Sequence, residues 1–268
     1  MMRMAFFIYG VTAHLLFLAV YVWLAGFVTN LVVPLSVDSP TSTPVPLAVV
    51  VDLGLIVLFG LQHSIMARPS FKQVWTRIVP QPIERSTYVF ASNAVTALLM
   101  WQWRAIDVVI WDVQQPAGRW LLWGLFGFGW LMVPAVSLMI HHFDLFGTRQ
   151  VWNYLRGREN TPLPFRTPLL YSQIRHPLYV GWAIFFWATP SMTVGHLLLA
   201  AGMTVYMLVA VVFEERNLLE YFGHQYAEYR RRVPMFIPWP RTSQPALRAF
   251  DEEHRGVVVT PGAAGELE

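Results

Sequence analysis

Runs of about twenty consecutive apolar residues constrain this chain more than any other feature, because a segment of that length crosses a lipid bilayer as a helix. The first run, residues 5–29, is about 37 Å long at about 1.5 Å per residue and exceeds the ~30 Å hydrocarbon layer. Further spans are predicted at residues 47–66, 87–103 and 120–140. Because 55% of the chain is apolar and only 13% is charged, we expect the surplus apolar surface to face lipid.

A broken apolar stretch follows in the C-terminal half. Pro190 separates the apolar residues 178–188 from the longer run 192–213, and a proline ends or bends a helix. Residues 214–232 carry Leu, Phe and Tyr at helical spacing among charges, which predicts an amphipathic helix on the membrane surface. The sequence therefore predicts an all-α integral membrane protein with about four transmembrane helices, a C-terminal helical hairpin bent at Pro190, and a cytoplasmic amphipathic helix.

The basic residues are distributed unevenly along the chain. The N-terminus and three later segments carry one, four, five and seven of the 19 basic residues, whereas residues 30–46 carry none and residues 104–119 carry two. Cytoplasmic loops retain positive charge during membrane insertion. We therefore expect the N-terminus and residues 67–86, 141–177 and 214–268 to share the cytoplasmic side.

Polar and ionisable residues collect at this cytoplasmic boundary. His63 ends the second span, His141 and His142 end the fourth, and His176 opens the hairpin. Nearby lie Gln62, Asp144, Arg149, Gln150, Arg175, Glu214 and Glu215. Helix ends at an interface are polar in any membrane protein, but here four separate segments converge, which indicates a candidate site. By contrast, His14 and His196 lie in apolar stretches, where we expect structural histidines.

Several classes of chemistry are excluded. The chain contains no cysteine, so it has no thiolate nucleophile, no cysteine-ligated zinc and no disulfide. A metal site from His63, His141, His142 and Asp144 would suit several divalent ions, but the His-His-x-Asp spacing is not diagnostic, and no metal is predicted. Nucleic acid is not an expected partner, because the membrane topology explains the positive charge. Gly124, Gly127 and Gly129 follow no strand, so we interpret them as helix-packing positions.

The sharpest local feature is Arg-His-Pro-Leu-Tyr-Val-Gly-Trp at residues 175–182. Proline after His176 disfavours helical geometry at that histidine and suits the first turn of a helix. The free N–H groups of such a helix start favour an anion, and Arg175 can hold a carboxylate by a forked pair. A second feature, Glu-Glu-Arg-Asn-Leu-Leu at residues 214–219, follows the last apolar run.

Together these two motifs resemble those of the isoprenylcysteine carboxyl methyltransferase superfamily, which are membrane-embedded enzymes. The resemblance covers about residues 171–240 and implies an S-adenosylmethionine site without a Rossmann fold, open to the cytoplasm. The cofactor-binding residues it implies are Gln173, Arg175, His176, Leu178, Tyr179, Glu214, Glu215 and Arg232. It also implies N-terminal transmembrane helices (1–140) followed by a methyltransferase core (141–240). We expect the tail (241–268) to be disordered, because its Pro, Gly, Ala and acidic residues offer little to bury.

Residues 59–68, 84–88 and 142–152 resemble NnrU-like proteins and the bacterial methanethiol S-methyltransferase family, and residues 188–197 resemble the latter family. This resemblance implies methylation of a small thiol, methanethiol, to dimethyl sulfide in a bacterial inner membrane. We expect His142, oriented by Asp144, as the base, with His63 or His176 as the competing base. Gln62, His63 and Arg149 are expected to contact the substrate. At His141 the family pattern predicts asparagine, which argues against a role for His141 and favours His142.

Three alternatives stay open at this stage. The chain could methylate a prenylcysteine carboxylate or another lipid-like thiol, which would need a wide opening toward lipid. An NnrU-like role in nitrogen-oxide metabolism would instead use the cytoplasmic histidines to bind haem or a metal. Apart from membrane lipids and a small substrate, the sequence predicts no partner and indicates no oligomeric state.

Overall fold

The computed structural model describes residues 1–238, and helices dominate this part of the chain. The elements are α1 (Met2–Thr29), α2 (Val45–Met66), α3 (Pro69–Trp75), α4 (Gln81–Gln102), β1 (Val109–Asp112), α5 (Pro116–Ile140), α6 (His142–Leu145), α7 (Thr148–Leu155), the short 3₁₀ helix η1 (Leu169–Ser172), α8 (Pro177–Trp187), β2 (Ser191–Thr193), α9 (Val194–Phe222) and α10 (His224–Arg232). The predicted tail, residues 241–268, lies outside the described residues.

Within residues 1–238, four helices are long and apolar enough to cross a membrane: α1, α2, α5 and α9. Many of their large apolar side chains lie on the outside of the bundle, as at Leu121 and Leu131, which are 65% and 60% exposed. Side chains of this kind need lipid as their surroundings. The prediction of an all-α integral membrane protein is confirmed. The helix α4, predicted as a span at 87–103, begins earlier at Gln81 and packs against both α1 and α2.

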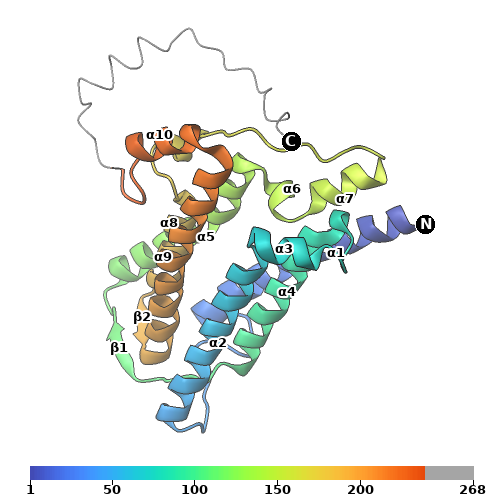
Figure 1. Cartoon of the computed structure of the whole chain (residues 1–268). Helices are drawn as coiled ribbons and strands as arrows, with labels where there is room; N and C mark the ends of the chain where they lie inside the picture. The colour runs from blue at the N-terminus through green and yellow to red at the C-terminus, as the bar shows by residue number, and fades with distance from the viewer. Residues whose placement is uncertain (239–268) are drawn as a thin grey trace, which may run out of the picture.

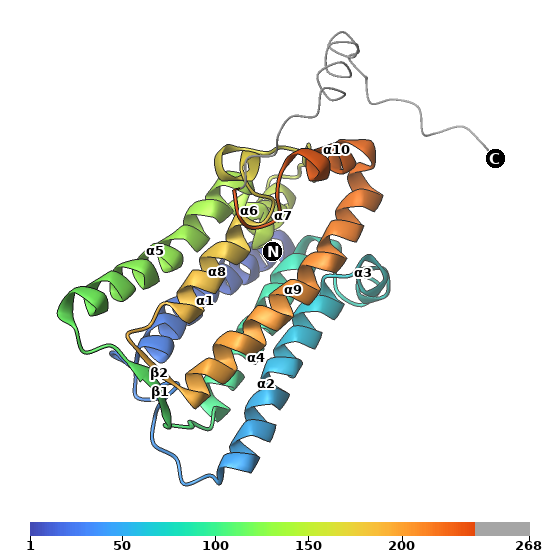
Figure 2. The same cartoon turned by 90° about the vertical axis from the view of Figure 1, so that its left-hand side faces the viewer.

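The two ends of the helix bundle differ in chemistry (Figures 1 and 2). The N-terminus, α3, α6, α7 and α10 gather at one end, and β1, β2 and the α1–α2 connection lie at the other. The segments at the first end are those predicted from their arginines to share one side of the membrane. We call this end the basic end.

The C-terminal hairpin turns at Pro190, as predicted, but it includes a small sheet that the sequence did not reveal. Strand β2 pairs antiparallel with β1, which belongs to the connection between α4 and α5. The backbone N–H of Val113 donates to the carbonyl of Pro190 at 2.9 Å, and that of Val194 donates to Val108 at 2.8 Å. The sheet therefore fastens the hairpin turn to the α4–α5 connection.

The prediction of a separate amphipathic helix over residues 214–232 is wrong in its boundary. Helix α9 continues without a break from the apolar run to Phe222, and the chain turns only at Gly223. Gly223 has a φ of 53°, a conformation that glycine adopts without steric cost. Within residues 214–232, α10 alone forms a separate short helix, and it lies across the basic end (Figure 1).

Candidate functional site

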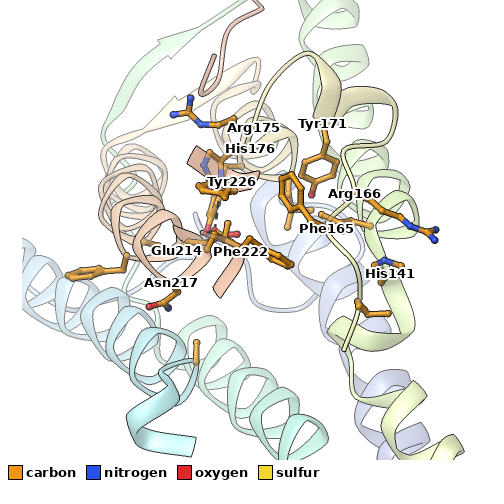
Figure 3. Close-up of a pocket in the computed structure, with 18 of the residues that line it drawn as sticks. His141, Phe165, Arg166, Tyr171, Arg175, His176, Glu214, Asn217, Phe222 and Tyr226 are labelled. Atoms are coloured by element: carbon orange, nitrogen blue, oxygen red, sulfur yellow. Dashed lines mark hydrogen bonds and ion pairs between the residues drawn. The ribbon is translucent and has the colours of Figure 1, made fainter. Parts of the chain in front are cut away.

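A cavity of about 510 Å³ lies at the basic end of the bundle. Its walls come from α2, α4, α8, α9, α10 and the connection between α7 and α8. Figure 3 shows Phe222 of α9 beside Phe165, which belongs to that connection. The cavity thus brings together elements that are far apart in the sequence.

The start of α8 forms one wall through a buried ion pair. Arg175 Nε donates to Glu215 Oε1 at 2.7 Å, and His176 Nε2 lies 3.1 Å from the same oxygen. The side chains of Arg175, His176 and Glu215 are each less than 10% exposed. The helix begins at Pro177, as the sequence predicts, with His176 as its N-cap. This cluster joins the start of α8 to the half of α9 that lies at the basic end.

Arg175 also anchors the end of the described chain. Its Nη1 donates to the carbonyls of Arg230 at 3.0 Å and Val233 at 2.6 Å. The backbone N–H groups of Arg175 and His176 donate to Pro234 and to the next residue, at 2.9 and 3.1 Å. Because Nε and Nη1 of Arg175 are engaged, only Nη2 remains for a ligand. The predicted forked contact with a free carboxylate would need two nitrogens of this side chain, so Arg175 does not offer it here.

Glu214 behaves differently from its neighbour Glu215. Its carboxylate is 46% exposed and accepts a hydrogen bond from the Tyr179 hydroxyl at 2.7 Å. Both Glu214 and Tyr179 line the cavity, as does Leu178. Tyr226 is only 2% exposed, and its hydroxyl has no hydrogen-bond partner among the described residues. The site therefore offers a reachable carboxylate and an unsatisfied hydroxyl to a polar ligand.

Aromatic rings form a further wall of the cavity. The Phe165 ring lies 5.1 Å from that of Phe222, 6.0 Å from that of Tyr226 and 5.4 Å from that of Tyr229. The Tyr229 hydroxyl donates to the carbonyl of Tyr171 at 2.6 Å, and burial raises the pKa of Tyr229 to about 12. Sequence reasoning treated the tyrosines as part of a surface helix and missed Phe165, which lies in an irregular segment.

The opposite end of the cavity reaches His63 on α2. The Tyr88 hydroxyl lies 2.7 Å from His63 Nε2, and the Ser92 hydroxyl lies 3.3 Å from His63 Nδ1. Ser92 donates its own hydrogen to the carbonyl of Tyr88 at 3.0 Å, so its oxygen accepts from Nδ1–H of His63. His63 Nε2 then carries the lone pair and accepts from the Tyr88 hydroxyl.

His142 does not line this cavity, whereas His141 does. His141 has a φ of 101° and ends α5, which directs the following residue toward α1. His142 Nδ1 lies 2.7 Å from the Ser137 hydroxyl, and its Nε2 lies 3.1 Å from His14. The predicted orientation of His142 by Asp144 is not formed, because Asp144 accepts instead from Arg149 at 2.6 Å and from the Gln150 amide.

The remaining predicted residues lie outside the first cavity. Arg149 lines a second, more open cavity of about 670 Å³ next to it. Gln62 donates to the sulfur of Met66 at 3.3 Å. Gln173 is exposed, and Arg232 forms an exposed ion pair with Glu228. In the part of the chain that the structure describes, no three His, Asp or Glu side chains come together as ligands for a metal ion.

Several known proteins are similar to this chain over most of its length. The methanethiol S-methyltransferase of Mycobacterium tuberculosis is 51% identical over 240 residues, which cover 90% of this chain and 98% of that protein. The methanethiol S-methyltransferase of Crocosphaera subtropica is 46% identical over 232 residues, 87% of this chain and 91% of that protein. Nurim from Sus scrofa is 32% identical over 176 residues, 62% of this chain and 66% of that protein. No protein-family model and no solved structure matches. By its identity to the first two enzymes over nearly their whole length, the chain belongs to the methanethiol S-methyltransferase family.

Proposed function

We propose that this enzyme transfers a methyl group from S-adenosylmethionine to methanethiol at the cytoplasmic face of a bacterial inner membrane. The observation that carries the proposal is a single cavity with two unlike ends. One end is charged and aromatic and comes mainly from residues 141–238. The other end is formed by His63 and Tyr88 in residues 1–140, together with Tyr206 of α9. In this division the C-terminal part binds the methyl donor and the N-terminal helices bind the thiol.

The residues of the charged end fit the chemistry of S-adenosylmethionine. A cavity of about 510 Å³ is within the usual range of roughly 300–1,000 Å³ for sites that bind small molecules. Glu214 offers its carboxylate to the ammonium group or the ribose hydroxyls, and the unpartnered hydroxyl of Tyr226 offers a further hydrogen bond. The rings of Phe165 and Tyr229 offer π-faces to the adenine and to the positive sulfonium.

The buried cluster of Arg175, His176 and Glu215 orients this end of the cavity. Through its two carbonyl contacts Arg175 fixes the segment that carries Tyr226 and Tyr229. His176 and Arg175 themselves line the cavity beside Leu178 and Tyr179 and complete the proposed donor site. Gln173 and Arg232 lie away from it, and we assign them no part in binding.

The methyl group of the donor is already activated by its sulfonium charge, so the protein has to align a thiolate with it and exclude water. We propose that the thiol proton passes to the oxygen of Tyr88 while the Tyr88 hydroxyl gives its proton to His63 Nε2. The 2.7 Å contact between these atoms supports this relay, as does the lone pair assigned to Nε2. The thiolate left by this step is the nucleophile, and His63 holds the proton as an imidazolium.

The test combines donor binding and product analysis on detergent-purified protein. Titration calorimetry with S-adenosylmethionine should show at least tenfold weaker binding to Glu214→Gln than to wild type. Glu228→Gln is the matched control, because Glu228 is a carboxylate of the same region that does not line the cavity. Equal affinity of the Glu214→Gln and wild-type proteins would contradict the proposed donor site.

Product analysis then identifies the acceptor. Protein given methyl-labelled S-adenosylmethionine and methanethiol should release labelled dimethyl sulfide into the headspace. A parallel reaction with a prenylcysteine should give no label in the acceptor. Label in the prenylcysteine alone would overturn the small-thiol assignment, and haem or metal bound without any donor binding would overturn the methyltransferase assignment for this cavity.

A further inference from the structure

Three rings close the cavity at the end away from α10. On each of three helices one ring is the lining residue farthest from the basic end: His63 on α2, Tyr88 on α4 and Tyr206 on α9. The ring centroids of His63 lie 5.1 Å from Tyr88 and 6.3 Å from Tyr206. Beyond these rings, α2 and α9 pack directly on each other. We call His63, Tyr88 and Tyr206 the ring floor.

Tyr206 is fixed in this floor by its neighbours on α2. Phe59 packs against it edge to face with centroids 5.5 Å apart, and Ser64 lines the cavity together with it. Gly60 lies directly behind the ring, since a Cβ on Gly60 would be 2.9 Å from Cδ2 of Tyr206. Gly60 does not line the cavity but Tyr206 does, so the ring stands between the backbone of α2 and the empty space.

We propose that the Tyr206 ring determines how long an alkyl group the acceptor thiol can carry. The inference rests on the proposed function, which places the thiol beside His63 and Tyr88. With the sulfur near these two residues, the alkyl group must occupy the space that Tyr206 bounds. A rigid aromatic floor excludes additional methylenes, because close-packed surroundings do not yield to extra volume without displacing side chains. One-carbon thiols fit above the floor, and longer ones meet the ring.

The test compares methanethiol with 1-butanethiol as acceptors, using the full-length protein in detergent with labelled S-adenosylmethionine. Each methylene in a hydrophobic site changes discrimination by roughly 10- to 200-fold. Tyr206→Ala should therefore raise the ratio of kcat/KM for butanethiol to that for methanethiol at least tenfold. Tyr206→Leu makes the same change with less loss of packing, and keeps the test available if the alanine variant does not fold.

Three further variants separate the size of the ring from other effects. Tyr206→Phe keeps the ring and removes the hydroxyl, so the ratio should stay within about twofold of wild type. Gly60→Ala should push the ring into the cavity and lower kcat/KM for methanethiol itself. Gly202→Ala is the packing control, because its Cβ would meet Ile56 at 2.8 Å in the same α2–α9 contact but away from the cavity. Its ratio should equal that of wild type.

A binding measurement without the methyl donor gives an independent readout. Butanethiol should raise the melting temperature of Tyr206→Ala but not that of wild type, since only the variant has space for the chain. Unchanged ratios and unchanged melting behaviour in both Tyr206→Ala and Tyr206→Leu would overturn the inference while the methanethiol activity of wild type upholds the proposed function. Absence of labelled sulfide from wild type with either thiol would instead overturn the proposed function, and this inference with it.

Discussion

Removal of the Glu215 carboxylate should release the C-terminal segment from the bundle. Glu215 is 9% exposed and Arg175 is 7% exposed, so the pair is largely shielded from water. Loss of one member of such a buried pair costs about 3–5 kcal/mol, because the other charge stays buried without its partner. At about 1.4 kcal/mol per factor of ten, Glu215→Gln should increase the population in which residues 223–235 are detached by about 10²- to 10⁴-fold.

Trypsin can measure this population. The segment contains three consecutive arginines, residues 230–232, whose side chains are exposed, but trypsin needs an extended backbone and therefore cleaves there only when α10 unfolds. When opening and closing are fast relative to cleavage, the cleavage rate follows the open population. Mass spectrometry of timed digests should therefore show cleavage at these arginines accelerating by the same factor in Glu215→Gln, up to the rate of an unstructured peptide.

The adjacent carboxylate provides a matched control. Glu214 is 46% exposed and accepts a hydrogen bond from the Tyr179 hydroxyl. Exposed charged contacts contribute little to stability, so Glu214→Gln should change the cleavage rate less than about threefold. If Glu215→Gln and wild type are cleaved at the same rate, the buried ion pair does not hold this segment, and the account of Arg175 as its anchor is refuted.

Three further predictions concern the histidines and the helix packing. His63→Gln should lower kcat by about 10²- to 10⁴-fold with donor affinity unchanged, whereas His142→Gln should lower kcat less than tenfold; the reverse order would assign the base to His142. Burial lowers the pKa of His142, so the unfolded chain binds a proton at this histidine more tightly than the folded chain does. The free energy of unfolding should therefore fall as the pH drops below about 6.5. Melting temperatures at pH 7.5 and 5.5 should therefore differ less in His142→Gln than in wild type, and an equal difference would contradict this. Gly129→Ala should lower the melting temperature, because its Cβ would lie 2.9 Å from the carbonyl oxygen of Gly181. The control is Gly127→Ala, whose Cβ meets nothing within 4 Å and which should leave the melting temperature unchanged or raise it. A similar loss in both variants would show that packing is not the cause.

Local chemistry made much of the fold predictable. Apolar runs of membrane length located α1, α2 and α5, and the dipeptide His176-Pro177 located the start of α8. These features depend on the residues of one segment and on general backbone constraints. The antiparallel pairing of β1 with β2 was not predictable in this way, because it depends on how two distant connections meet.

The candidate site was predictable as a region but not in its details. Glu214 and Glu215 are adjacent and chemically identical, yet the helical rotation between them turns one toward the cavity and the other into the buried ion pair. Likewise, the backbone conformation of His141 decides which of two neighbouring histidines reaches the cavity. Histidine adopts a positive φ more often than most residues, but this preference does not tell which of two adjacent histidines adopts it. Phe165 depends on the path of an irregular segment, which apolar periodicity does not describe.

The small sheet stabilises a hairpin whose two helices differ in length. Helix α8 has 11 residues and rises only about 16 Å, whereas α9 rises about 32 Å from Val194 to Glu215, which faces the start of α8. Residues 188–193 make up the difference, and after Ala188, whose N–H still donates to the carbonyl of Ile184, their backbone groups lack the partners of a regular helix. Strand β1 and the indole N–H of Trp111, which donates to the Thr189 carbonyl at 3.2 Å, supply those partners. Residues 188–193 thus extend a crossing for which α8 alone is too short, and the α4–α5 connection supplies the hydrogen bonds that they need.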